Sequence, residues 1–281
     1  MSEAVLQEAL DFGALLKDWR AHRRVSQLDL SSLSGISQRH ISFLETGRSR
    51  PSRAMVLALS DSLDIPLRER NALLQSAGFA AVYPEAPLDG QRTARFQAAL
   101  QATLEHHEPY PALVLDGRWN LVMANEGALR FFGQFVDIFE ALAAIGSPTE
   151  FQVARLCLAE QGLKPYIVNW QELAFSFLAR ARRALLVNPR DAHLPELIRE
   201  ISEHPDAPAS WRQPDWMAMP DPALAMEMEK DGVRYRLFTM LAHFGAAQSV
   251  TLEELSVETF FPADEATRSH LEALARSAPA R

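Results

Sequence analysis

One segment of the sequence, 27–47, restricts the possible folds of this chain most strongly. It contains two short helical patterns, 27–33 and 38–46, which are separated by Gly35 at a turn where the backbone tends to need a positive φ. The small Ser31 allows the two helices to cross closely. The segment therefore predicts a helix-turn-helix whose second helix packs against the first and lies at the surface.

Helical patterns on both sides of this segment extend it into a domain. Apolar residues at three- and four-residue spacing predict a helix over 11–24. Pro51 and Ser52 precede a fourth helical pattern over 53–63, and a fifth follows over 66–75. We therefore predict an all-α domain of five helices over 1–80.

The net charge of −8 is distributed unevenly along the chain. Residues 1–80 carry a net charge of +1, and residues 81–281 carry −9. Within 20–53, seven arginines against two acidic residues give +5. A local basic patch on an acidic protein suggests a footprint for nucleic acid, and a solvated arginine-rich surface is the alternative.

In a helix-turn-helix, the first residues of the second helix contact base edges in the major groove of DNA. Glutamine can bond adenine through two hydrogen bonds, and arginine can bond guanine in the same way. Four of the predicted contacts (Gln27, Thr46, Arg48 and Arg50) would bind the phosphate backbone. The complete predicted set of DNA-binding residues is Gln27, Ser37, Gln38, Arg39, His40, Ser42, Phe43, Thr46, Arg48 and Arg50.

The remainder of the chain predicts a second domain of α+β class over 92–270, after a proline-containing linker over 81–91 and before a tail over 271–281. Two Asp-Gly pairs are hairpin signals, which favours an antiparallel sheet. The predicted strands, about five, are 110–115, 119–124, 223–229, 233–243 and 252–261. The predicted helical segments are 93–105, 150–187 and 194–203, and Asn125 can cap a further helix that carries Leu129, Phe131 and Phe132.

Several features argue against other classes of protein. Cys157 is the only cysteine, so an intramolecular disulfide and a cysteine metal cluster are excluded, and we expect a packed thiol. The sequence has no stretch of 18 apolar residues and no signal-peptide pattern, so we expect a cytoplasmic protein that does not contact a membrane. The common nucleophile and phosphate-binding motifs are also missing, and we expect neither catalytic residues nor a metal site.

Three short patterns carry a resemblance to a known family: Ser26-Gln27, Ile36-Ser37 and Ile41-Ser42-x-Leu44-Glu45-x-Gly47-x-x-x-Pro51. Over residues 10–80 the chain resembles the XRE family of Cro/repressor-like helix-turn-helix proteins. The resemblance implies binding to double-stranded DNA. A homodimer on a pseudo-palindromic operator is expected, because one short recognition helix reads few bases.

A second resemblance covers the α+β region. The hairpin pattern from Tyr110 to Asn125 is followed by Val168-Asn-Trp170, by the segment 194–201 and by Ser210-Trp211. Together these are similar to the MmyB/MltR-type PAS-like ligand-binding domain of bacterial transcription regulators, of which this chain resembles a divergent branch beyond residue 215. The resemblance implies a small, largely apolar ligand such as a fatty acid or an acyl derivative.

Apolar residues of the predicted strands and of the helix after 170 could line such a pocket, or fill a solid core. Arg234 or Arg236 could anchor a carboxylate. The predicted ligand-binding residues are Trp119, Leu121, Met123, Trp170, Phe177, Leu178, Met226, Phe238 and Met240.

We therefore predict a ligand-responsive transcription regulator that is not an enzyme and holds no cofactor other than a bound fatty acid or similar small molecule. Two alternatives stay open. The α+β domain could be a sensor or enzyme that carries haem, through His243, or flavin. The chain could also be an antitoxin-like regulator that binds a protein partner.

Overall fold

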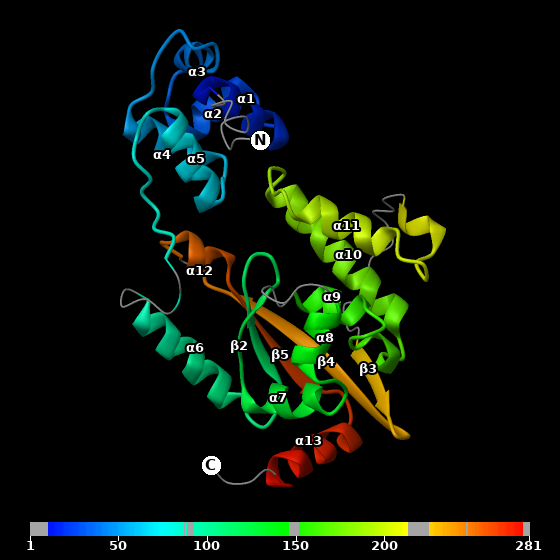
Figure 1. Ribbon diagram of the computed structural model, residues 1–281. Helices are drawn as coiled ribbons and strands as arrows, with labels where there is room; N and C mark the ends of the chain where they lie inside the picture. The colour runs from blue at the N-terminus through cyan, green and yellow to red at the C-terminus, as the bar shows by residue number, and fades with distance from the viewer. Residues whose placement is uncertain are drawn as a thin grey trace. The chain divides into compact units, whose positions relative to one another are not determined.

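Figure 1 shows the chain in a computed structural model as two compact units: Met1–Glu85 with Ala246–Glu253, and Ala86–Gly245 with Glu254–Arg281. The structure describes residues 11–86, 88, 93–145, 152–212, 225–245 and 247–277. Parts of the predicted linker (87 and 89–91), of the strand predicted from 223, and of the tail (278–281) lie outside the described residues.

Five helices of the first unit confirm the predicted helical domain. They are α1 (Phe12–His22), α2 (Gln27–Ser34), α3 (Gln38–Glu45), α4 (Arg53–Ser62) and α5 (Leu67–Ser76). Serines at the N-caps of α2, α3 and α4 each accept a backbone hydrogen bond, which explains where these helices begin. Trp19, Leu30, Ile41 and Leu44 are almost fully buried at the centre of this unit.

The first unit also contains α12 (Val250–Glu254), in a segment predicted as part of a strand over 252–261. That prediction is wrong for 252–254, because the Ser249 hydroxyl accepts a hydrogen bond from the Leu252 backbone amide and starts a helix. Val250 is fully buried and its amide donates to the Pro84 carbonyl, at 3.0 Å. The Glu253 carboxylate accepts a hydrogen bond from the first amide of α5, that of Leu67, at 2.7 Å.

The second unit is built on the predicted five-stranded antiparallel sheet, and its strand order is β2-β1-β5-β4-β3. The strands are β1 (Ala112–Leu115), β2 (Leu121–Ala124), β3 (Ala225–Lys230), β4 (Val233–His243) and β5 (Ser256–Pro262). The β3–β4 turn has positive φ at both Asp231 and Gly232, which matches the predicted hairpin signal. A bulge between Val114 and Leu115 shifts the pairing of β1 with β2.

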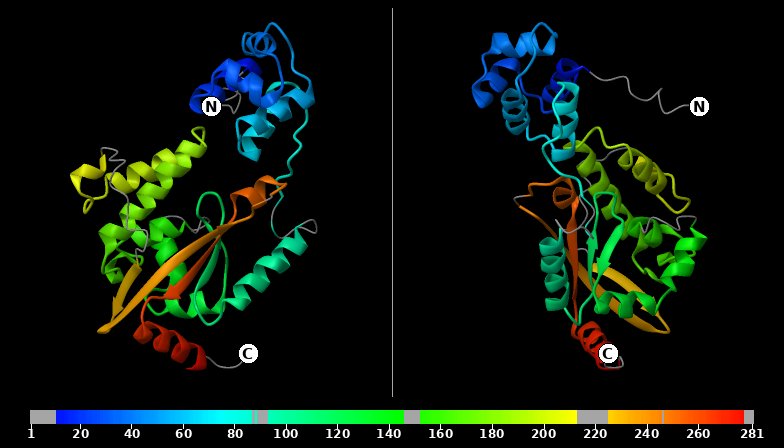
Figure 2. Two further views of the ribbon diagram at one scale, coloured as in Figure 1. Left: turned by 180° about the vertical axis from the view of Figure 1, so that it is seen from behind. Right: turned by 60° about the vertical axis from the view of Figure 1, so that its left-hand side comes forward.

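Helices cover both faces of this sheet (Figure 2). On one face, α6 (Ala94–His106) contacts β1 and buries Leu100 and Leu104. The larger core lies on the other face, where Phe131 packs edge-to-face against Phe132 and Tyr235. The remaining helical elements are α7 (Glu126–Gly133), α8 (Ile138–Ala144), α9 (Val153–Leu158), η2 (Lys164–Tyr166), α10 (Trp170–Val187), α11 (Leu194–Ser202), η3 (Ala209–Arg212) and α13 (Glu265–Ser277).

Two differences from the predicted helices matter for the site. The segment predicted as helical over 150–187 is interrupted, because α9 ends at Leu158 and the long α10 begins at Trp170. In addition, α13 was not predicted, although Asp264 accepts a hydrogen bond from the Thr267 amide and Leu271 is buried, which are signals of a capped amphipathic helix.

Candidate DNA-binding surface and ligand cavity

The turn between α2 and α3 has the geometry that the sequence predicted. Gly35 has a φ of +70°, where a side chain would be strained. Ser37 then caps α3 by accepting a hydrogen bond from the His40 amide, at 3.3 Å. The N-terminal turn of α3 therefore begins directly after the turn of the motif.

The predicted DNA-binding residues gather on α3 and on the segments beside it. Gln38, Arg39, Thr46, Arg48 and Arg50 are exposed, as is Ser37, whereas Gln27, His40, Ser42 and Phe43 are half-buried. The Arg39 guanidinium lies 5.3 Å from the centroid of the Phe43 ring, one helical turn later. The Thr46 hydroxyl donates to the Ser42 carbonyl, at 2.8 Å, so part of its bonding capacity is used inside the helix.

Glu45, to which the sequence analysis gave no separate role, joins three helices. Its carboxylate accepts two hydrogen bonds from Arg20, at 2.6 and 3.0 Å, and one from the side-chain amide of Gln27, at 2.8 Å. The side chains of Arg20 and Glu45 are only 16% and 3% exposed, and the hydrogen bond to Glu45 raises the pKa of Arg20. This cluster holds Gln27 in place at the start of α2 and fixes α1 and α2 against the end of α3.

Two of the seven arginines of 20–53 make hydrogen bonds within the domain. Arg20 binds Glu45, and the Arg23 guanidinium donates to the carbonyls of Leu63 and Asp64, at 2.9 and 2.7 Å. The other five arginines of 20–53 are exposed: Arg24, Arg39, Arg48, Arg50 and Arg53. Five exposed arginines, rather than all seven, are therefore available to bind phosphate.

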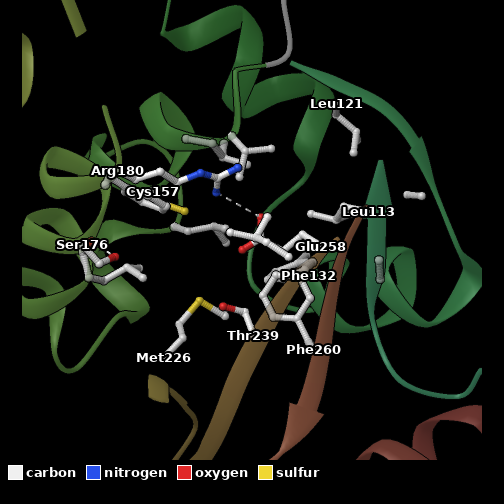
Figure 3. A pocket seen from close by; sticks show the side chains of 18 of the residues that line it. Leu113, Leu121, Phe132, Cys157, Ser176, Arg180, Met226, Thr239, Glu258 and Phe260 are labelled. Atoms are coloured by element: carbon white, nitrogen blue, oxygen red, sulfur yellow. Dashed lines mark hydrogen bonds and ion pairs between the residues drawn. The ribbon is translucent and has the colours of Figure 1, made fainter. Parts of the chain in front are cut away.

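The second unit contains a cavity of about 360 Å³ between the sheet and the helices on its larger core face (Figure 3). Most of its lining is aliphatic or aromatic. The lining residues are Leu113, Leu121, Ala124, Ala128, Leu129, Phe132, Ile138, Val153, Leu156, Cys157, Leu163, Leu173, Ser176, Phe177, Ala179, Arg180, Arg183, Met226, Thr239, Leu241, Glu258 and Phe260.

Three of the predicted ligand-binding residues, Leu121, Phe177 and Met226, line this cavity. The other six do not: Trp119, Met123, Trp170, Leu178, Phe238 and Met240. Trp119, Trp170 and Leu178 are instead packed in the core. These positions are apolar for reasons of packing, which the residue type alone does not distinguish from ligand binding.

Three of those six residues, Met123, Phe238 and Met240, lie on strands. In each case a neighbouring residue of the strand faces the cavity instead. On β4, Thr239 and Leu241 face the cavity, so Phe238 and Met240 face the opposite side, where Phe238 stacks on Phe261. On β2, the bulge against β1 puts Leu121 and not Met123 on the cavity face.

An ion pair that the sequence analysis missed lies in the cavity (Figure 3). A guanidinium nitrogen of Arg180, on α10, lies 3.9 Å from a carboxylate oxygen of Glu258, on β5, and the two side chains are 24% and 10% exposed. Burial raises the pKa of Glu258, although Arg180 partly opposes this shift, and burial lowers the pKa of Arg180. Arg180 also lies over the Trp119 ring, 4.5 Å from its centroid.

A signal for this pair exists in the sequence. Glu258 lies two residues before Phe260 on an alternating strand, and Arg180 lies three residues after Phe177 on an amphipathic helix. Arg234 and Arg236, the carboxylate anchors considered from the sequence, instead pair with acidic residues of β3.

Other polar groups around the cavity are less suited to chemistry. Burial raises the pKa of the Cys157 thiol to about 12, so the thiol stays neutral. His243, the residue considered for haem, is exposed at the end of β4 and is not part of the cavity lining. Among the described residues, no group of three or more His, Cys, Asp or Glu side chains could hold a metal ion.

In the described part of the chain, no helix combines the length and apolar character needed to cross a bilayer.

Comparisons with known proteins identify the family of each domain. Residues 11–73 match the model of a helix-turn-helix domain, and residues 96–274 match the model of the MmyB-like transcription regulator ligand binding domain. No protein with a curated description matches the chain. A solved structure titled "Structure of an RNA-binding Light-Oxygen-Voltage Receptor" shares 15% identity over 98% of this chain and 68% of its own, but the TM-score of 0.26 gives this likeness no weight. The second model spans more than half of the 281 residues, and the chain therefore belongs to the MmyB-like transcription regulators.

Proposed function

We propose that this regulator binds a pseudo-palindromic DNA operator as a homodimer, and that a small, largely apolar, fatty-acid-like ligand in the cavity changes its affinity for DNA. One observation carries the proposal: the domain that matches a ligand-binding family contains an apolar cavity of about 360 Å³. Cavities for small molecules are roughly 300–1,000 Å³ and are mostly apolar with a few polar groups.

Support for DNA binding comes from the helix-turn-helix. Gln38 and Arg39 are exposed on the first turn of α3, and Arg48 and Arg50 are exposed just beyond its end. The former are suited to base edges and the latter to phosphates. A dimer is proposed because two recognition helices, one helical turn of DNA apart, read enough base pairs to define a site.

The segment between β4 and β5 offers a way for ligand binding to affect DNA binding. Thr239 and Leu241 of β4 and Glu258 and Phe260 of β5 line the cavity. The segment that connects these two strands, Ala246–Glu253, packs as part of the helix-turn-helix unit. A ligand that moves β4 relative to β5 therefore acts on the two ends of a segment held by the DNA-binding unit.

A cavity-filling substitution tests the proposal. Ala179 lines the cavity, and Ala179→Phe places a ring in the space that a ligand would occupy. We expect decanol, an apolar chain with a neutral head group, to bind the unmodified protein in isothermal titration calorimetry and to bind this variant at least tenfold more weakly. The matched control is Ala99→Phe on the exposed side of α6, which leaves decanol binding unchanged.

The DNA side of the proposal uses the same proteins. We expect decanol to change the affinity of the unmodified protein for its operator, measured by fluorescence anisotropy, and to have no such effect on Ala179→Phe. Native mass spectrometry of the gently purified protein reports any co-purified molecule, including haem or flavin. Equal decanol binding by Ala179→Phe and Ala99→Phe would reject the cavity as the ligand site.

A further inference from the structure

The Glu258 carboxylate lies inside the cavity, and none of the described residues donates a hydrogen bond to it. Its side chain is nine-tenths buried, and its strand neighbours on β1 and β4 are Leu113 and Leu241. Arg180 approaches it only to 3.9 Å, which is longer than a direct hydrogen bond of about 2.7–3.2 Å. Among the described residues, no N–H or O–H group donates a hydrogen bond to this carboxylate.

The Arg180 guanidinium is in a similar position. It stacks on Trp119 and lies near Glu258, but within the described part of the chain it donates no hydrogen bond. Among the described residues, the buried Glu258 and the half-buried Arg180 thus face a shared space, the first with free acceptors and the second with free donors. Buried charges are stable when hydrogen bonds satisfy them, so a group that bonds both is favoured in this space.

The head group that fits is one that donates to Glu258 and accepts from Arg180 at the same time. A carboxamide or a hydroxyl does both, whereas an ionised carboxylate only accepts and would lie beside the negative charge of Glu258. We propose that the ligand is an apolar chain that ends in a neutral donor–acceptor head group, such as a fatty amide, and that Glu258 and Arg180 bind its two sides. The inference rests on the proposed function, because it requires that a ligand occupies the cavity.

The other charged and titratable groups near Glu258 do not change this conclusion. Cys157 faces Glu258 from α9 and is neutral, and Arg183 lines the cavity from α10 but is exposed to solvent. A carboxylate ligand could enter with a proton, since burial raises the pKa of Glu258. Such binding takes up one proton, and its affinity falls as pH rises by at most about tenfold per pH unit.

Calorimetric titration of the full chain with decanamide and with decanoate tests the head group. At pH 8 we expect decanamide to bind at least tenfold more tightly than decanoate. Glu258→Gln should reduce this preference at least fivefold. The glutamine side chain is uncharged and can donate a hydrogen bond to the carboxylate of decanoate. The matched control, Glu227→Gln, changes a carboxylate of the same sheet that pairs with Arg234 and Arg236, and should keep the preference.

The unmodified protein offers a second measurement that does not depend on a variant. Between pH 6 and pH 8, the affinity for decanoate should fall and the affinity for decanamide should stay constant. Equal affinities for the two ligands, or a preference unaffected by Glu258→Gln, would overturn the head-group assignment. In those cases decanol binding would leave the proposed function intact, whereas failure of all three alkyl ligands to bind would reject both.

Discussion

At the residue scale, the two sites differ in how far the hydrogen-bonding groups of their central side chains are satisfied. In the helix-turn-helix, Glu45 satisfies Arg20 and Gln27 at once and so holds α1, α2 and α3 together. In the cavity, Arg180 and Glu258 are placed by their helix and strand but are not satisfied by each other. A complete cluster stabilises a fold, and an incomplete one offers bonds to a ligand.

The exposed residues around α3 lead to a contrast between two kinds of substitution. Arg39→Ala should weaken operator binding by about 1–3 kcal/mol and relax specificity at one base position, because its role would be base recognition. Arg48→Ala should weaken binding to all sequences alike and reduce the salt dependence by about one phosphate contact. Fluorescence anisotropy with operators that differ at single base pairs, at several salt concentrations, measures both effects.

A substitution on another helix of the same domain serves as the control. Lys17 is exposed on α1, and Lys17→Ala should change neither specificity nor affinity by more than about 0.5 kcal/mol. A uniform loss of affinity from Arg39→Ala, without relaxed specificity, would show that α3 does not read base edges.

At the element scale, some side chains of α10 face the cavity and others are packed in the core. Phe177 and Arg180 face the cavity, whereas Leu178 is fully buried in the core and does not line it. The periodicity of α10 predicted an apolar face but not which part of that face remains open. This depends on the helices packed against α10, since α11 contacts it directly and covers part of its surface.

Two leucines of α10 allow a matched test of this division. Leu178→Ala should destabilise the second unit by about 2–5 kcal/mol, because it leaves a hole in a close-packed core. Leu186→Ala, on the same helix, should cost less than about 1 kcal/mol, because that side chain is 51% exposed. Thermal unfolding followed by circular dichroism measures both changes, and equal losses would contradict the packing described for α10.

At the scale of the whole molecule, the chain runs from the sensor sheet into the DNA-binding unit and back again. The segment between β4 and β5 carries α12, and Glu253 of α12 accepts a hydrogen bond from the first amide of α5. Because four cavity residues belong to these two strands, ligand and DNA are coupled in our proposal through this segment.

Substitution of Glu253 tests the coupling. Glu253→Ala should reduce the effect of decanol on operator affinity at least threefold, because α5 loses a side-chain partner at its N-terminus. Decanol binding itself, measured by calorimetry, should not change. Glu265→Ala on the exposed start of α13 serves as the control and should keep the full effect. An unchanged ligand effect in Glu253→Ala would exclude this segment as the route.

Local chemistry in the sequence was sufficient for much of this description. Serine caps, glycines with positive φ and apolar spacing predicted the five helices, and the Asp231-Gly232 pair predicted the β3–β4 hairpin. These features act within a few residues of the chain, so they are visible before folding. The exposed residues of α3 follow from the same local pattern.

The tertiary structure alone decided which apolar side chains surround a space and which fill a core. The phase of β4 and the bulge before Leu115 each put predicted residues on the side of the sheet away from the cavity. Arg180 and Glu258 meet although 78 positions separate them in the sequence. The physical reason is that packing and ion pairing depend on distance in space, which helix and strand periodicity cannot determine for elements far apart in the chain.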